Sequence, residues 1–401
     1  LVPHAVKRPN NLERIRNQMS LLRTLHRKTF MMHSRSLANA VMHSKCGVPR
    51  DVLKVEKVDS SKVGPSDIAI KMLAAPINPS DINMIEGTYG IKAQLPAVAG
   101  NEGVGVVKQV GDKVTSFKVG DWVIPRGGGF GTWRDEAVAN ESAVDRVPND
   151  IPVGYAAVLG VNPCTAYRLL KDFGNLKPGD YIIQNAANSM VGHAVVQLAN
   201  LMGIKTINVV RADRPDVFNE LRLLDNLGGA INIPSDYVNS PGFRDILADL
   251  DGSLKVAFNA VGGESATDLA RCLSYGGTMV TYGGMAKRPV TIPQELLNYK
   301  GLRMEGFWIT EWVSKNSKED RELMLEDLAG WVRQDQLSLF LEMHDFDDFS
   351  FALDKSQTPF RRRKVVLNMD FPDRMAQHDE LLKDADRNYT YPFEVDPILQ
   401  Y

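Results

Sequence analysis

The sequence predicts an α/β protein in which a doubly wound parallel sheet is inserted into a β-rich domain. From Val52 to about Val147, short β-like runs alternate with Gly, Pro, Asn and Asp turns, which is typical of a β-rich unit. From about Cys164, strand-like and helix-like segments alternate instead, which indicates a parallel sheet with crossover helices. The length of 401 residues supports this division, because single hydrophobic cores stop growing at roughly 250–300 residues.

Six strands are expected in the parallel sheet. They are YIIQNA (181–186), TINVV (206–210), AINIP (230–234), KVAFNAV (255–261), TMVTYG (278–283) and RMEGFWI (303–309). Helices are expected between them, for example at Gly192–Gly203 and Pro215–Leu227. The second of these begins with a proline and is followed by Gly228, as is typical of helix ends. Six strands with intervening helices match the doubly wound sheets that bind nucleotides.

The last part of the chain is interpreted as returning to the first domain. A polar helix is expected over about Lys318–Gln334, and the segment after Phe349 ends in a strand-like run. Four divisions are predicted. Residues 1–45 form a mitochondrial transit or disordered segment, and residues 46–165 with 310–370 form the β-rich domain. Residues 166–309 form the nucleotide-binding domain, and residues 371–401 are an acidic extension to which the sequence assigns no role.

Composition and charge exclude several classes of function. The formal net charge of -2 argues against nucleic-acid binding, because binding phosphates needs an excess of Lys and Arg. No apolar run approaches the roughly 20 residues of a membrane-spanning helix, so no membrane insertion is expected. Cys46, Cys164 and Cys272 lack metal-ligand spacing, which favours a reducing compartment over a disulfide framework.

The N-terminal segment is basic and free of acidic residues. Between Arg14 and Arg50 there is no Asp or Glu, while arginines and lysines recur among leucines, methionines and hydroxyl residues. This composition is typical of a mitochondrial transit peptide and predicts a location in the mitochondrial matrix. Two alternatives are a disordered basic arm and an interfacial helix on anionic lipid.

The turn after the first strand of the parallel sheet is a candidate phosphate-binding turn. Such turns usually carry G-x-G-x-x-G, but here Ala187 and Ser189 occupy the first two positions and only Gly192 remains. Asn188 and Ser189 are expected to donate to phosphate oxygens beside the helix N-terminus. The alternative is a strand-to-helix turn that binds nothing.

The end of the second strand predicts the cofactor. An acidic residue there favours NAD, whereas arginine favours the 2′-phosphate of NADP, and the strand ends in Arg211 with Arg214 close behind. Asp213 argues against this preference, because an acidic residue in the ribose pocket would favour NAD. The alternative for Arg211 is that it is a solvated residue at the strand end without a role in binding. Loops at the carboxyl ends of later strands, Asn259–Gly263 and Tyr282–Met285, are expected to line the same crevice or to be tight turns.

Several motifs occur in an order that resembles a known family. They include NPSDINMIEGTYG (78–90), AGNEGVGVVKQVGDKVTSFKVGDWVIP (99–125), GVNPCTAY (160–167) and GFWITEW (306–312). Over about residues 52–370 the chain resembles the medium-chain dehydrogenase/reductase superfamily, and within it the zinc-free mitochondrial trans-2-enoyl thioester reductases. The resemblance implies a Rossmann-type sheet inserted in a GroES-like catalytic domain.

The ligands of the zinc-binding branch of this superfamily are absent. Asn101 stands where that branch has a histidine, no cysteine lies near Asn78–Ser80, and none stands at Val161. Four tetrahedral ligands cannot be gathered from the remaining residues, so no metal site is expected.

Without a metal, hydride must reach a carbon that needs no Lewis acid, and the β carbon of an α,β-unsaturated thioester meets this condition. The resulting enolate then needs a proton at its α carbon. The resemblance implies that Tyr89 has this role, since a tyrosine hydroxyl is protonated at pH 7 and can donate a hydrogen bond. The alternative is a packed or surface tyrosine.

The resemblance also implies a set of cofactor-binding residues. These are Asn162 near the nicotinamide; Asn188, Ser189, Met190 and Val191 at the phosphates; Arg211, Asp213 and Arg214 at the ribose phosphate; and Tyr282, Gly283, Gly284, Met285, Phe307, Trp308, Ile309 and Lys364 elsewhere along the cofactor. Arg361, Arg362 and Arg363 either form a solvated strand edge or attract the phosphates of coenzyme A or of an acyl-carrier protein's pantetheine arm.

The resemblance thus implies an NADPH-dependent reductase of enoyl thioesters, carried by coenzyme A or acyl-carrier protein, in mitochondrial fatty acid synthesis. A homodimer joined through the nucleotide-binding sheets is expected by the same resemblance. Two alternatives stay open: a zinc-free NADPH quinone oxidoreductase, and a non-catalytic NADPH-binding co-regulator.

Overall fold

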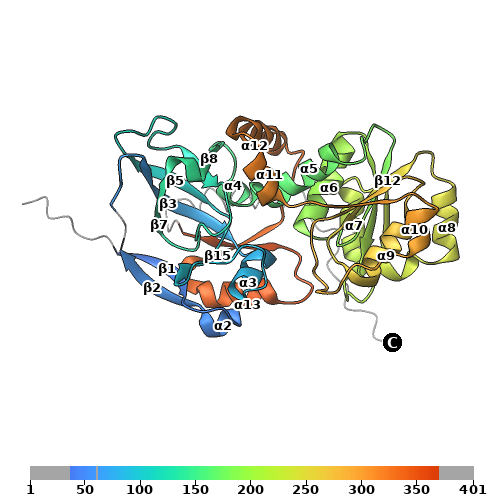
Figure 1. The fold of residues 1–401 in the computed structure, drawn as a ribbon, viewed down its shortest axis with the longest axis horizontal. Coiled ribbons are helices and arrows are strands. Elements are labelled where there is room, and N and C mark those ends of the chain that lie inside the picture. Colours follow the sequence, from blue (N-terminus) through green and yellow to red (C-terminus); the bar gives the residue numbers. More distant parts are fainter. Residues whose placement is uncertain (1–36, 60–61, 370–401) are drawn as a thin grey trace, which may run out of the picture.

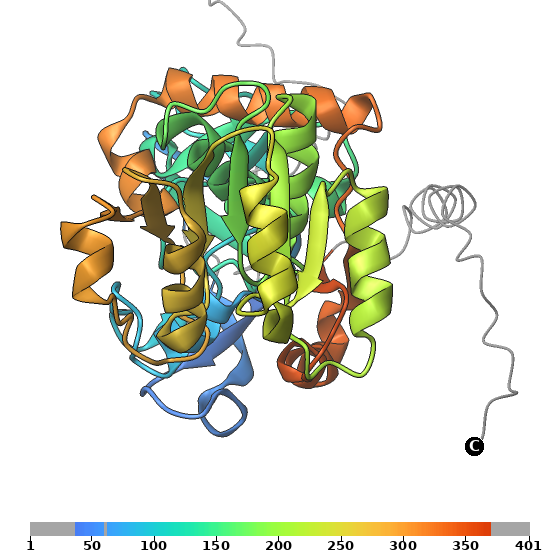
Figure 2. The same ribbon diagram turned by 90° about the vertical axis from the view of Figure 1, so that its right-hand side faces the viewer.

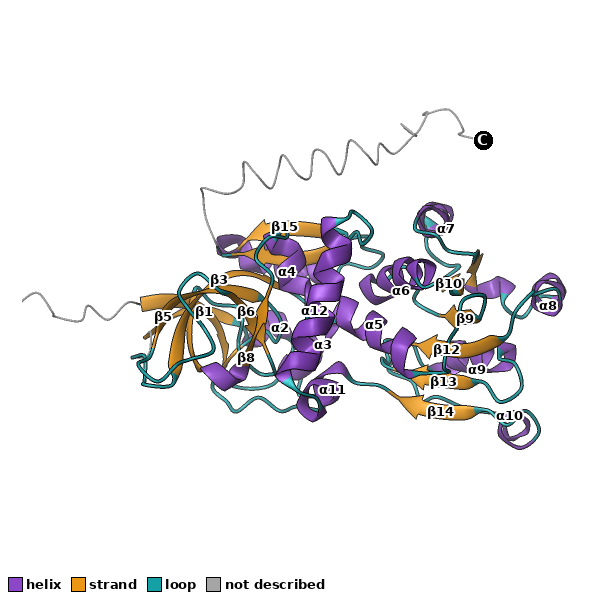
Figure 3. Cartoon of the chain, turned by 90° about the horizontal axis from the view of Figure 1, so that it is seen from above, coloured by secondary structure: helices purple, strands orange, loops and turns teal. Residues whose placement is uncertain are grey.

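The computed structural model describes residues 37–59 and 62–369. A six-stranded sheet covered by helices forms one side of the molecule, and two sheets rich in short strands form the other (Figure 1). The helices α5 (Asn162–Asp172) and α12 (Lys318–Arg333) lie between the two sides (Figure 3). Among these residues no helix has the length and apolar character needed to cross a membrane.

The six-stranded sheet is parallel throughout, in the order β11-β10-β9-β12-β13-β14. Its strands are β9 (Tyr181–Gln184), β10 (Lys205–Val210), β11 (Ile231–Pro234), β12 (Leu254–Asn259), β13 (Thr278–Thr281) and β14 (Arg303–Gly306). The connecting elements are α6 (Met190–Leu201), α7 (Val217–Asn226), η2 (Ser235–Tyr237), α8 (Pro241–Ala248), α9 (Gly263–Cys272) and α10 (Gln294–Asn298). Helices cover both faces (Figure 2), so the predicted doubly wound, Rossmann-type sheet is confirmed.

The sixth predicted strand is too long. It was expected to reach Ile309, but β14 ends at Gly306, and α11 (Ile309–Lys315) begins at the predicted end. The neighbouring strand β13 ends at Thr281, opposite Gly306, so the backbone beyond Gly306 has no strand to pair with. Ile309 packs instead into the largest hydrophobic core cluster, which spans both sides of the molecule.

The β-rich side contains a seven-stranded sheet with the order β15-β16-β3-β5-β6-β8, in which β7 also pairs with β3. Its strands are β3 (Asp67–Pro76), β5 (Val104–Val110), β6 (Trp122–Pro125), β7 (Glu136–Asn140), β8 (Val144–Val147), β15 (Leu341–Asp345) and β16 (Lys364–Asn368). The remaining helices are α2 (Pro49–Val52), α3 (Pro79–Ile85), η1 (Glu141–Ala143), α4 (Val153–Leu159), η3 (Phe346–Asp348) and α13 (Phe349–Gln357). The pairing of β16 with β3 agrees with the expected return of the chain to the first domain.

A three-stranded sheet, in the order β2-β1-β4, corrects one prediction. It consists of β1 (Leu37–His43), β2 (Lys54–Asp59) and β4 (Ala97–Val98). Strand β1 lies inside the segment 1–45 that was expected to be a transit or disordered segment, and its Ala40 and Val41 are fully buried. The expectation is therefore wrong for this strand, because an acid-free apolar run is equally compatible with a buried strand. The rest of the expected transit segment up to residue 36, and the acidic extension 371–401, lie outside the described residues.

Candidate active site

A cleft of about 710 Å³ is lined by residues from both sides of the molecule. The predicted site residues that line it are Tyr89, Asn162, Asn188, Ser189, Met190, Val191, Arg214, Tyr282, Gly283, Gly284, Met285, Phe307, Trp308, Ile309 and Lys364. Two predicted residues, Arg211 and Asp213, are not part of the lining. They are mostly exposed and form an ion pair with each other, with 2.9 Å between Arg211 Nε and Asp213 Oδ1.

Tyr89 lies on the loop after α3 and meets Trp308 across the cleft. The indole Nε1 of Trp308 donates a hydrogen bond of 2.9 Å to the Tyr89 hydroxyl oxygen, and the two rings pack edge to face with centroids 6.0 Å apart. Partial burial raises the pKa of Tyr89, and hydrogen bonding from Trp308 opposes this rise. The hydroxyl is therefore protonated at pH 7, and because the indole uses its oxygen as acceptor, its hydrogen is left to donate to a ligand.

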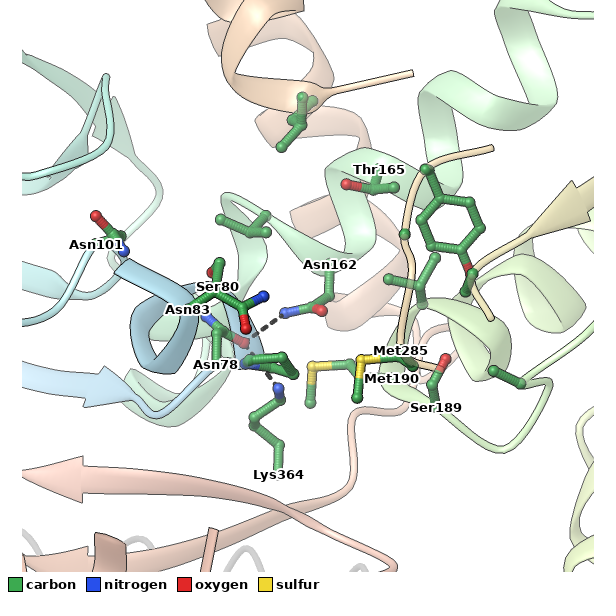
Figure 4. A pocket seen from close by; sticks show the side chains of 18 of the residues that line it. Asn78, Ser80, Asn83, Asn101, Asn162, Thr165, Ser189, Met190, Met285 and Lys364 are labelled. Atoms are coloured by element: carbon green, nitrogen blue, oxygen red, sulfur yellow. Dashed lines mark hydrogen bonds between the residues drawn. The ribbon is translucent and has the colours of Figure 1, made fainter. Parts of the chain in front are cut away.

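The floor of the cleft is a connected set of buried polar side chains. Asn78 caps the N-terminus of α3, and its Oδ1 accepts a 2.7 Å hydrogen bond from Lys364 Nζ (Figure 4). Asn162 Nδ2 approaches the same oxygen at 3.5 Å (Figure 4). Beneath them, Glu102 accepts hydrogen bonds of 2.7 Å from Asn78 Nδ2 and from the backbone N–H of Val161. This network fixes the side chains of Asn162 and Lys364 where they face the cleft.

Burial perturbs the charged groups of this floor strongly. It raises the pKa of Glu102 to about 8, against the hydrogen bond from Asn78 and the charge of Lys364. It also lowers the pKa of Lys364 to about 8, and the nearby Arg361 adds to this lowering. Asp81, which accepts hydrogen bonds from the backbone of Asn78 and from Asn101, has its pKa raised by burial to about 6. Such clusters of perturbed groups in a cleft are typical of functional sites.

The turn between β9 and α6 is built for close approach of a ligand. Ser189 caps α6 by accepting a hydrogen bond from Gly192 N at 3.1 Å. A Cβ atom on Gly192 would stand 2.6 Å from the carbonyl carbon of Ala187 and would also overlap its oxygen, so glycine is required at this position. The N–H groups of Gly192 and His193 are bonded to Ser189, while Met190 and Val191, the first two residues of α6, line the cleft and have no partner within the helix for their N–H groups. An anion-binding turn requires such free N–H groups.

Arg214 lies at another part of the cleft wall and is almost completely buried. It forms ion pairs with Asp216 (3.0 Å) and Glu220 (3.2 Å), and its Nη2 donates to the backbone oxygen of Phe360 at 3.1 Å. The Phe360 ring also lies beside the guanidinium groups of Arg211 and Arg214, 4.9 and 5.4 Å from its centroid. Of the two arginines expected at the ribose phosphate, Arg214 is therefore the one on the cleft.

Comparisons with known proteins agree with this geometry. Residues 64–149 match a family described as alcohol dehydrogenase GroES-like domain, and residues 191–328 match one described as zinc-binding dehydrogenase. A mitochondrial enoyl-acyl-carrier-protein reductase of Xenopus tropicalis is 47% identical over 87% of this chain and 99% of its own length. The chain belongs to the enoyl-acyl-carrier-protein reductase family.

Two solved structures of such reductases share the fold. The mitochondrial 2-enoyl thioester reductase Etr1p/Etr2p heterodimer from Candida tropicalis is 34% identical with a TM-score of 0.75, covering 83% of this chain and 100% of the other. The complex of Etr1p with NADP and crotonyl-CoA is 33% identical with a TM-score of 0.76 and the same coverage. The family is part of the medium-chain dehydrogenase/reductase superfamily, whose Rossmann-type and GroES-like architecture the chain shares.

Zinc, which the description of one matching family implies, does not fit this member of the reductase family. Asn101 holds the position of the expected histidine ligand, and both atoms of its amide are engaged: Nδ2 donates to Asp81, and Oδ1 accepts from Gly129 N at 2.6 Å. In the described ranges no group of three or more His, Cys, Asp or Glu residues is arranged to hold a metal ion. An amide already bonded in this way is not a zinc ligand.

Some residues of the reductase site were not predicted from the sequence. Asn78 and Glu102 belong to the sequence motifs, but the sequence predicted no role for them or for Phe360. A signal for Asn78 exists in N-P-S-D, where an Asx residue, a proline and an acid at the third helical position indicate a capped helix start. No comparable signal marks Glu102, whose partners Asn78 and Val161 lie 24 and 59 residues away.

Replacing Glu102 with Gln is expected to flatten the pH dependence of stability. Because the pKa of the Glu102 carboxyl is raised to about 8 in the folded protein, its contribution is fully present at acidic pH and is lost as the pH rises through 8. Asp81 acts in the same direction nearer pH 6, while Lys364, with its lowered pKa, loses its contribution as the pH falls through 8. The free energy of unfolding should therefore fall between about pH 5 and pH 8 in the unaltered protein.

In Glu102→Gln this fall should be reduced to the part that Asp81 contributes, as measured by urea unfolding at a series of pH values. Glu319→Gln, at an exposed position in the first turn of α12, is the control and should keep the slope of the unaltered protein. An unchanged slope in Glu102→Gln would show that this carboxyl does not titrate differently in the folded and unfolded states.

Proposed function

We propose that this chain is an NADPH-dependent reductase of trans-2-enoyl thioesters that acts in fatty acid synthesis in the mitochondrial matrix. The observation that carries the proposal is the pairing of Tyr89 with Trp308, which leaves a protonated hydroxyl directed at a cleft without a metal ligand set. Enoyl-acyl-carrier-protein reductases named mitochondrial, nearly half identical over most of the chain, support the activity and the location.

The residues of the cleft suit a dinucleotide cofactor, which when bound supplies a hydride to the β carbon of the substrate. Ser189 and the first backbone N–H groups of α6 bind its phosphates, and Arg214 faces the ribose phosphate that distinguishes NADPH from NADH. Asn162 and Lys364, held by Asn78, orient the nicotinamide end. Arg211 and Asp213, which neutralise each other outside the lining, have at most an indirect part.

Tyr89 performs the second half of the reaction in this proposal. Its hydroxyl donates a hydrogen bond to the thioester oxygen as negative charge develops there, and it supplies the proton that the α carbon takes up. Trp308 holds the hydroxyl oxygen in place by its 2.9 Å hydrogen bond, so the hydroxyl hydrogen is directed away from the indole. Phe307 and Ile309, on either side of Trp308, contribute apolar surface to the same wall.

The likeness to a heterodimeric reductase and the exposed edge strand β14 support a homodimer joined through the six-stranded sheets. All four residues of β14 are exposed, and Met304 among them is apolar. An unpaired strand edge of this kind is a surface on which a second copy can continue the sheet.

The proposal is tested by following NADPH oxidation with crotonyl-CoA and, separately, with a quinone. Turnover of crotonyl-CoA with a kcat/KM above about 10⁴ M⁻¹s⁻¹, and slower turnover with NADH, is the expected result. Turnover of the quinone alone would make the chain a quinone oxidoreductase. Binding of NADPH without turnover of either would instead support the non-catalytic co-regulator.

A further inference from the structure

The three consecutive arginines before β16 do not share one environment. Arg362 forms a 2.7 Å ion pair with Asp216 and lies 3.6 Å from Glu220, so its charge is already compensated. Arg361, the next residue toward the N-terminus, lines the cleft, and its guanidinium donates to the backbone oxygen of Ser356. In residues 37–59 and 62–369, Arg361 has no carboxylate as an ion-pair partner. All three arginines line the cleft, and Arg361 differs from Arg362 in having no described carboxylate beside it.

The position of Arg361 is unfavourable for a cation without a ligand. Its side chain is largely removed from solvent, which lowers its pKa, and no nearby acid opposes this effect. The charge of Arg361 in turn lowers the pKa of another cation, Lys364. Burying a guanidinium beside an ammonium costs free energy in the unliganded protein, and a bound anion would offset that cost.

The backbone around Arg361 places it between the two ends of the cleft. Phe360, before it, has a φ of 60°, a left-handed conformation that is strained for a bulky residue, and is held there by Arg214. Lys364, after it, is bonded to Asn78 at the floor where Asn162 lies. Arg214 marks the expected ribose phosphate, and Asn162 the expected nicotinamide. The stretch between them corresponds to the pyrophosphate of a dinucleotide.

The phosphate turn belongs to the same neighbourhood. Asn188 of that turn hydrogen-bonds Glu220, the same carboxylate that Arg214 and Arg362 approach. The run 360–364, which comes from the β-rich side, therefore lies along the same cleft as the start of α6, which comes from the six-stranded sheet. A phosphate between them would contact backbone N–H groups on one side and a guanidinium on the other.

We propose that Arg361 is a phosphate-binding residue of the cleft and that its ligand is the pyrophosphate of the dinucleotide cofactor. The guanidinium supplies several N–H donors, of which Ser356 uses one, and phosphate oxygens match the planar geometry of the others. The pyrophosphate of coenzyme A and the phosphate of a pantetheine arm have the same chemistry and are the other source of the anion. This inference rests on the proposed function for the identity of the cofactor.

The test compares Arg361→Gln with Arg244→Gln. Arg244, in α8 and outside the cleft lining, also donates to a backbone oxygen, that of Asn239, and has no ion pair with a described residue. Both variants therefore lose one charge and one hydrogen bond of the same kind. Calorimetry with NADP⁺ and with adenosine 2′-monophosphate, which keeps the ribose phosphate but has neither phosphate of the pyrophosphate, measures binding without requiring turnover. Initial rates with crotonyl-CoA and with crotonyl-N-acetylcysteamine, which lacks phosphates, measure the thioester side.

In Arg361→Gln the Kd for NADP⁺ should rise about tenfold to a hundredfold, the usual effect of a charge-assisted hydrogen bond. The Kd for adenosine 2′-monophosphate should change less than about twofold, because this ligand has no pyrophosphate phosphate for Arg361 to bind. The Tm of the unliganded protein should not fall, because repulsion of Lys364 is removed. Arg244→Gln should resemble the unaltered protein in all these measurements.

Two results would overturn the proposal in different ways. A higher KM for crotonyl-CoA, with normal values for crotonyl-N-acetylcysteamine and NADP⁺, would assign the arginine to the thioester carrier instead of the cofactor. Unchanged binding of every ligand would remove the phosphate site altogether. Arg361-dependent binding of NADP⁺ by a chain that reduces no thioester would leave this inference standing while the proposed function fails.

Discussion

Replacing Tyr89 with Phe is expected to lower kcat/KM for crotonyl-CoA by about 10²- to 10⁴-fold, with most of the loss in kcat. The change removes the hydroxyl that donates to the thioester oxygen and supplies the proton. A loss of this size is what removal of a general acid usually causes. The aromatic ring stays, so its packing against Trp308 is retained, and the indole N–H, on a side chain that is 37% exposed, can turn to water. Steady-state rates and NADP⁺ affinity measured on the same preparation check this expectation.

The affinity for NADP⁺ and the Tm of Tyr89→Phe should stay close to those of the unaltered protein. Tyr299→Phe is the matched control, because Tyr299 is 82% exposed and lies outside the cleft lining, and it should leave the rate unchanged. If Tyr89→Phe kept more than about a tenth of the original kcat/KM, the donor would have to be another group, since a loss that small is below what removal of a general acid causes.

Gly192→Ala is expected to weaken cofactor binding by at least about a hundredfold and to destabilise the fold. The loss of stability is the reverse of what alanine usually causes in a helix. Elsewhere in a helix, Gly→Ala stabilises by about 0.5–1 kcal/mol. Here the new methyl group would stand 2.6 and 2.7 Å from backbone atoms of Ala187, so the turn or the start of α6 must move. Overpacking of this kind costs about 1–3 kcal/mol, and it displaces the N–H groups that bind phosphate.

Gly330→Ala provides the control, because Gly330 is inside α12 and a Cβ there meets no atom within 4 Å. Urea unfolding should show that Gly330→Ala is more stable than the unaltered protein and that Gly192→Ala is less stable. The Kd of Gly192→Ala for NADP⁺ should rise by at least about a hundredfold. Equal stabilisation by both substitutions would mean that the turn before α6 adapts to a side chain and that its glycine has no steric role.

The parallel sheet was predictable because its signals are local. Five of its six strands contain β-branched residues, and the exception is β14. Pro215 and Gly228 mark the ends of one helix, so the predicted limits Pro215–Leu227 lie within two residues of those of α7. The errors arose where tertiary structure decides. At Ile309 an apolar run continued past the end of the neighbouring strand, and at β1 a buried strand resembled a targeting segment in composition.

The site was predictable in its residue types but not in its pairings. Tyr89 and Trp308 were each expected to line the pocket, yet their hydrogen bond joins positions 219 residues apart, and no periodicity reports such a contact. Sequence spacing likewise could not separate Arg211 from Arg214. The two arginines differ in their partners. Arg211 forms an ion pair with Asp213, whereas Arg214 donates a hydrogen bond to the backbone oxygen of Phe360.

The antiparallel pairing of β16 with β3 has a consequence for the time course of synthesis. On a ribosome, β3 emerges almost 300 residues before its partner, and the whole six-stranded sheet is made in between. Until β16 arrives, Asn78 lacks the ammonium group of Lys364 and β3 has one open hydrogen-bonding edge at its C-terminal end. The reductase cleft is therefore among the last features that a nascent chain completes, and a chain released early carries an exposed strand edge in its place.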